Sequence, residues 1–111
     1  MTRPANLFAD LPAHANTEHF TTLLDNPHCR VERIVSFGQT SPEGFWYDQA
    51  WDEWVLLLRG SADIDLVERT VALTPGDHLL IPAGQKHRVT RTAPDQATIW
   101  LAIHLNAPAK S

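Results

Sequence analysis

The chain has 111 residues, of which 43% are hydrophobic and 20% are charged, and its formal net charge at pH 7 is −4. This length suits one domain with one core, and the composition excludes disorder and a collagen-like repeat. The mildly acidic balance disfavours binding to the phosphates of nucleic acids.

A single cysteine, Cys29, excludes an intrachain disulfide and a cysteine-rich zinc site. The first fifteen residues have no basic stretch followed by a continuous apolar one, so we expect no secretory signal. The longest apolar run, residues 54–58, falls short of the roughly 20 residues that span a bilayer. These observations favour a cytoplasmic protein with no membrane or nucleic-acid partner.

Residues 1–28 are interrupted by prolines and are expected to pack on the rest of the domain as a short helix or an extended segment. Thr17 can cap such a helix. Three apolar residues would fall on one stripe of it at helical spacing: Phe20, Leu23 and Leu24.

Residues 29–106 have the pattern of short strands separated by turns, and residues 107–111 form a tail. The predicted strands are 30–37, 53–58, 62–67, 71–73, 78–81, 87–92 and 98–105, with 45–47 also extended. Seven or eight short strands with no alternating helical pattern predict a sandwich or small barrel. The strands at 53–58 and 99–105 are apolar on both faces, so either the N-terminal segment or a second copy in a homodimer must cover the outside.

Two polar residues lie on strand faces that are otherwise apolar. Glu53 shares a face with Val55 and Leu57, where a carboxylate needs a partner or a metal unless it is solvated at the end of the strand. His87 shares a face with Val89 by the same alternation. Neither residue alone predicts a metal site.

The chain resembles the cupin superfamily in two motifs. Four residues have the spacing of the second motif: Gly76, Pro82, Gly84 and His87. Glu53 and Gly60 have the spacing that ends the first motif. The resemblance covers about residues 38–105. It implies an all-β double-stranded β-helix, or jelly-roll barrel, in which Glu53 and His87 point inward at a shared metal.

The first motif departs from the family, because its usual His-x-His is absent. Depending on the gap before Glu53, the two positions are Tyr47 and Gln49 or Trp46 and Asp48. Gln49 or Asp48 could supply an oxygen ligand beside Glu53 and His87. Such a set suits a divalent Zn, Fe, Mn or Ni ion, and no organic cofactor is expected.

His104 is a further candidate metal ligand or base. It shares a face with Trp100 and Ala102, and this face lines either the lumen or the outside of the barrel near a dimer contact. The parity of the strand does not decide between the two.

Tyr47 and Arg91 are candidate substrate-pocket residues. Arg91 has the parity of His87 and stands where the family usually has Asn, so an inward guanidinium could hold a substrate carboxylate or Glu53. The alternative is an outward Arg91 on a solvated basic edge.

Two functions remain open at this point. The first is a small-molecule-binding cupin with a divalent metal on Glu53 and His87, which could serve a metal-dependent enzyme of unassigned reaction. The second is a non-catalytic ligand-binding or sensing cupin with a degenerate metal site, because fold alone does not assign an activity.

Overall fold

The computed structural model describes residues 2–13 and 16–108, so the last three residues of the predicted tail lie outside the described part. The described residues form eight strands in two antiparallel sheets, without a helix. The strands are β1 His19–Asp25, β2 Cys29–Ser36, β3 Asp52–Arg59, β4 Ala62–Asp65, β5 Thr70–Leu73, β6 His78–Ile81, β7 Arg88–Thr92 and β8 Thr98–Leu105. The all-β jelly-roll prediction is thereby confirmed.

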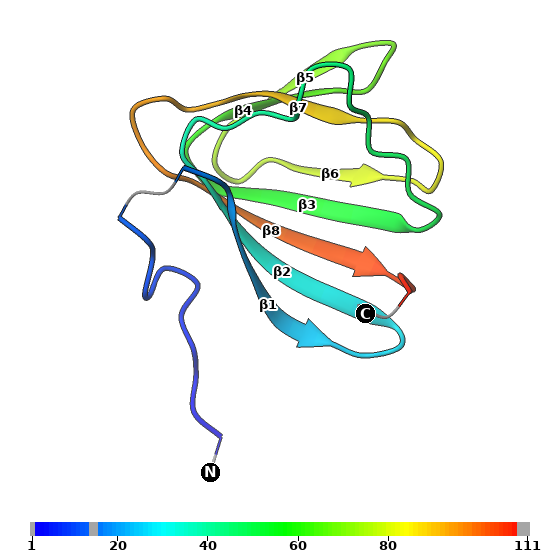
Figure 1. Ribbon diagram of the computed structural model, residues 1–111. Helices are drawn as coiled ribbons and strands as arrows, with labels where there is room; N and C mark the ends of the chain where they lie inside the picture. Colours follow the sequence, from blue (N-terminus) through cyan, green and yellow to red (C-terminus); the bar gives the residue numbers. More distant parts are fainter. Residues whose placement is uncertain (1, 14–15, 109–111) are drawn as a thin grey trace.

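The two sheets lie face to face around the core (Figure 1). The larger sheet has the strand order β1-β2-β8-β3-β6, and the smaller has the order β5-β4-β7. Side chains from both sheets form one buried apolar cluster: Val55, Leu57, Ala62, Ile64, Leu66, Leu73, Ile81, Trp100 and Ala102. Four of these residues also line a cavity, which is described below: Val55, Ile64, Ile81 and Trp100.

The centre of the larger sheet is the pairing of β3 with β8. Glu53 lies opposite His104, and Val55 lies opposite Ala102. Because side chains alternate along a strand, these residues share the inner face of the sheet. The prediction that Glu53 lies on the same face as Val55 and Leu57 is confirmed, since all three are buried.

The N-terminal segment contains a strand where a helix was one of two predicted forms. Residues 19–25 form β1, the edge strand beside β2, with Phe20 opposite Ile34. The helical alternative is wrong for these residues, because a short segment gains more from pairing with an open sheet edge than from an isolated helix. A bulge between Thr22 and Leu24 shifts the register, so the apolar spacing there mimics a helical stripe.

The outer face of the larger sheet is apolar. Trp54 and Leu56 on β3 alternate with the core residues and are half-buried, whereas Leu80 on β6 is 53% exposed. Part of the N-terminal segment packs against this sheet, because Arg33 donates to the carbonyl oxygens of Leu7 and Ala9. The homodimer remains a prediction, and this face is where a second copy would pack.

Residues 2–13 and 16–108 contain no helix long and apolar enough to cross a membrane.

Gly60 lies in the turn between β3 and β4, in a backbone conformation that only glycine adopts without strain. Its φ is +88°, and a Cβ there would lie 2.7 Å from the Thr98 Cα and closer still to the Thr98 hydroxyl oxygen. Both the strain and the contact with backbone oppose any side chain at this position. The glycine that ends the first motif is therefore a packing requirement of the β3–β8 junction.

We expect Gly60→Ala to lower the free energy of unfolding by about 2–4 kcal/mol, because backbone must shift to admit the methyl group. Urea denaturation followed by tryptophan fluorescence measures this change. Gly44→Ala is the matched control, since Gly44 also has a positive φ, +77°, but has nothing within 4 Å of its Cβ position. Equal losses in the two variants would contradict the close-approach argument.

Candidate functional site

A cavity of about 360 Å³ lies between the two sheets. Its apolar wall comes from both sheets: Ile34, Val55, Ile64, Val89 and Trp100. Its polar residues gather on neighbouring strands of the larger sheet and on the segments that carry Tyr47 and His87. A concave, mostly apolar space with a few converging polar groups is typical of a small-molecule site.

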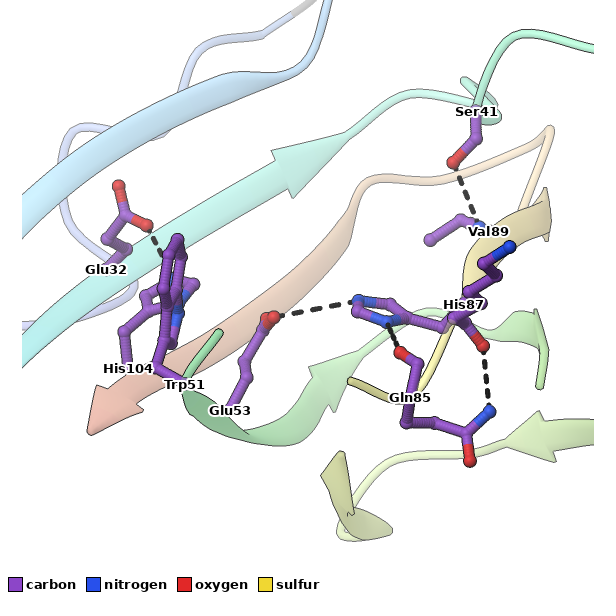
Figure 2. Close-up of polar contacts among 9 residues, drawn as sticks. Glu32, Ser41, Trp51, Glu53, Gln85, His87, Val89 and His104 are labelled. Carbon is purple, nitrogen blue, oxygen red and sulfur yellow. Dashed lines mark hydrogen bonds and ion pairs between the residues drawn. The ribbon is translucent and has the colours of Figure 1, made fainter. Parts of the chain in front are cut away.

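Glu53 and His87 face each other inside this cavity (Figure 2). Glu53 Oε1 lies 3.7 Å from His87 Nε2, and the two residues are 8% and 6% exposed. The other ring nitrogen, Nδ1, lies 3.0 Å from the carbonyl oxygen of Gln85. A carbonyl only accepts, so Nδ1 carries the proton, and the Nε2 lone pair of a neutral His87 points toward Glu53.

The pKa of His87 is raised above its usual 6.5. Burial is the largest influence and lowers the pKa, but the Glu53 carboxylate and the Gln85 carbonyl together outweigh it. Without a metal, the pair therefore favours a protonated His87 beside an ionised Glu53.

Tyr47 holds His87 in place and also lines the cavity. The two residues exchange backbone hydrogen bonds of 2.8 and 3.1 Å, and their rings stack with centroids 5.3 Å apart. Burial first, and then the charges of Glu18 and Glu53, raise the pKa of Tyr47 above 10. Its phenol therefore stays protonated near neutral pH and can donate a hydrogen bond to a ligand.

Of the two residues that could supply the oxygen ligand, only Gln49 lines the cavity. Its Oε1 is buried with no hydrogen-bond partner among the described residues. Asp48 is exposed and lies outside the cavity lining, so the alternative that placed Asp48 at the metal is wrong. The alignment of Tyr47 and Gln49 with the family's two histidines is the one that matches this placement.

His104 faces the lumen, but its ring nitrogens are already used. The Trp51 indole donates to Nδ1 at 3.0 Å, and Nε2 lies 2.9 Å from Glu32 Oε1. An indole can only donate, so Nδ1 accepts and Nε2 carries the proton that is donated to Glu32. The prediction of His104 as a metal ligand is wrong for this reason, because neither ring nitrogen has a lone pair free for an ion.

Arg91 lies on the outside of the barrel, so its prediction as an inward substrate clamp is also wrong. It is exposed and pairs with Asp63 at 3.2 Å. The cause is a bulge, because Ile64 pairs with Val89 but Asp63 pairs with Arg91, which leaves Thr90 as an extra residue. The extra residue reverses the side-chain parity between His87 and Arg91.

Sequence reasoning missed three charged residues that line the cavity: Glu18, Arg30 and Glu32. On β2, Arg30 and Glu32 alternate with Val31 and Arg33, so both faces of this strand carry charged and apolar residues. Alternation alone could not show which face points inward. The partner strand decides it, because Arg30 lies opposite His104 on β8.

The described part of the chain holds no group of three or more His, Cys, Asp or Glu side chains placed to bind a metal. The possible donor set is therefore two such residues, Glu53 and His87, together with the amide oxygen of Gln49. One imidazole and two oxygens suit a hard or borderline divalent ion.

We expect the metal-free protein to lose stability as pH rises above about 6.5, the usual pKa of an imidazole. The raised pKa of His87 in the folded state contributes stability below the unfolded pKa, and this contribution disappears above the folded pKa. Urea denaturation across this range, in chelator, measures the loss. His87→Gln is expected to remove this part of the pH dependence. An unchanged pH dependence in His87→Gln would show that the Glu53–His87 pair does not contribute.

Comparison with known proteins agrees with this architecture. The family model described as Cupin domain matches residues 36–104. A candidate mannose-6-phosphate isomerase from Ralstonia eutropha JMP134 is 44% identical, with a TM-score of 0.90, over 96% of this chain and 100% of that one. A cupin superfamily protein from Desulfitobacterium hafniense DCB-2 is 22% identical, with a TM-score of 0.77, over 95% and 92% of the two chains.

The similarity to the Desulfitobacterium protein, at 22% identity, shows the fold alone. The family match covers more than half of the chain, and it includes Glu53, His87 and His104. The chain belongs to the cupin family.

Proposed function

We propose that this cupin binds a small molecule in its barrel together with a divalent cation held by Glu53, His87 and Gln49. The observation that carries the proposal is the 3.7 Å separation of Glu53 Oε1 and His87 Nε2. That distance is too long for a hydrogen bond. It suits two ligands of one ion, which lie about 3–4 Å apart when each is about 2.1 Å from the metal.

The second shell of His87 supports the same proposal. Metal-binding histidines commonly donate their other N–H to a carbonyl or carboxylate, which fixes the tautomer. Here the Gln85 carbonyl accepts from Nδ1, and the Gln85 side chain anchors its own turn by donating to the Leu66 carbonyl at 2.9 Å. His87 thus presents Nε2 to the cavity before any ion binds.

The unpartnered Oε1 of Gln49 is a buried acceptor that needs a donor or a cation. The charge of the cavity points the same way. Among the described lining residues, three carboxylates face one guanidinium, so the formal charge is −2 when the histidines are neutral. A divalent cation would balance this charge.

The bound cation would polarise an oxygen of the ligand and orient it. The chain's own residues would then supply the remaining contacts: Tyr47 donates a hydrogen bond, and Val55, Ile64 and Trp100 exclude water. The reaction itself stays unassigned. The description of the Ralstonia protein makes a phosphorylated sugar one ligand to test.

We expect untagged protein to contain close to one divalent ion per chain, measured by elemental mass spectrometry. Glu53→Gln and His87→Gln should each lose it, because each removes a ligand from an already small set. Gln49→Leu should weaken affinity by about tenfold or more. Asp48→Asn is the matched control, since Asp48 is exposed and its change should leave the metal content unaltered.

A parent protein without metal, even after incubation with Fe(II), Mn, Ni and Zn salts, would contradict the metal site. The metal-free ligand-binding cupin would then be the better account. Metal retained in both Glu53→Gln and His87→Gln would instead place the ion elsewhere.

A further inference from the structure

Arg30 is a cation buried in the wall of the cavity with few partners. It lies on β2 directly opposite His104 of β8, and its side chain is 11% exposed. Its Nε is buried and has no hydrogen-bond partner among the described residues. The hydrogen bond recorded for its Nη1 is long, 3.4 Å to the carbonyl oxygen of Pro108.

Glu32 does not satisfy this guanidinium. Glu32 Oε1 lies 3.7 Å from Arg30 Nε, beyond hydrogen-bond distance. The same oxygen already accepts the Nε2 proton of His104 at 2.9 Å. A guanidinium has five N–H donors in a planar fork, and a buried donor without an acceptor is costly. The cavity wall therefore holds a buried guanidinium donor, Nε, that an acceptor on a ligand could satisfy.

We propose that Arg30 is the anion-binding residue of the cavity and that the ligand carries an oxyanion, either a carboxylate or a phosphate. Both groups present two oxygens that can accept two parallel hydrogen bonds from the planar guanidinium fork. This inference rests on the proposed function, because the ligand occupies the same cavity as the cation.

The sheet register sets the size of such a ligand. Arg30, His104 and Glu53 lie in one cross-strand row on β2, β8 and β3. Adjacent strands are about 4.8 Å apart, so the backbones at Arg30 and Glu53 are separated by about 10 Å. A molecule with a short carbon chain can place its oxyanion at Arg30 and another oxygen near Glu53 and His87. The apolar wall then contacts the carbon skeleton.

The test uses the full chain in metal-free form, so that no ion competes for the anion. Inorganic phosphate and acetate are titrated separately, with chloride at the same ionic strength as the reference. The readout is the ¹⁵N–¹H signal of Arg30 Nε, identified by its loss in Arg30→Gln. Arg91→Gln is the matched control, because Arg91 is exposed on the outside of the barrel and pairs with Asp63.

We expect at least one anion to shift the Arg30 signal to saturation at millimolar concentrations in the parent and in Arg91→Gln. Tryptophan fluorescence should show affinity for that anion reduced about tenfold or more in Arg30→Gln, consistent with the loss of a charge-assisted bidentate contact. Saturation by phosphate alone identifies a phosphate ligand, and saturation by acetate alone identifies a carboxylate.

A shift that never saturates, or an affinity that Arg30→Gln leaves unchanged, overturns the proposal. Metal content is measured separately on the same preparations before chelation. A parent that contains metal but binds neither anion contradicts only the role of Arg30. A parent that binds an anion through Arg30 but holds no metal contradicts only the cation site.

Discussion

The pairing of β3 with β8 is the constraint on which the cavity depends. It sets Glu53 beside His104 and Val55 beside Ala102 on the inner face of the larger sheet. Arg30, His104 and Glu53 therefore form one polar row across the sheet, and Ala102 and Val55 lie in the next row beside Glu32. The close approach of Gly60 to Thr98 lets the two strands run together where β3 ends. A substitution that disturbs this junction would displace the strand that carries Glu53.

The two buried imidazoles differ because their neighbours differ. His87 contacts the carbonyl of Gln85, which can only accept a hydrogen bond, so Nδ1 carries a proton and Nε2 faces Glu53 in the cavity. His104 contacts the indole of Trp51, which can only donate, so its other nitrogen presents an N–H to Glu32. One ring is thus prepared for a cation and the other holds a carboxylate in place. From residue type alone, the two histidines would have been assigned the same role.

Buried polar atoms without partners give the cavity its chemical preference. Gln49 offers an acceptor and Arg30 offers donors, and both line the same space. Because leaving such groups unpaired costs free energy, a ligand that satisfies both gains affinity. A small molecule with an oxyanion, bound next to a cation on Glu53 and His87, would do so.

The sequence by itself determined seven of the eight strands closely; β1 was the exception, and the extended stretch predicted at 45–47 is not one of the eight. β6 and β8 have the predicted bounds, because turns with proline and glycine delimit short alternating strands. Glu53 and His87 could be named from their spacing and from the cost of a carboxylate on an apolar face. The cupin fold followed from the two motifs, since the glycines and prolines in them meet backbone requirements that are local.

Only the tertiary structure decided which way the remaining polar side chains point. Strand parity is local until an extra residue interrupts it, and the extra residue Thr90 turns Arg91 outward. The segment before β3 has no ladder to set its parity, so the bridge between Tyr47 and His87 decides that Gln49 and not Asp48 lines the cavity. Arg30 and Glu32 could not be found from β2, because both of its faces are mixed. Their orientation is set by pairing with β8, which is far away in the sequence. The residue pattern within a single segment carries no information about that pairing.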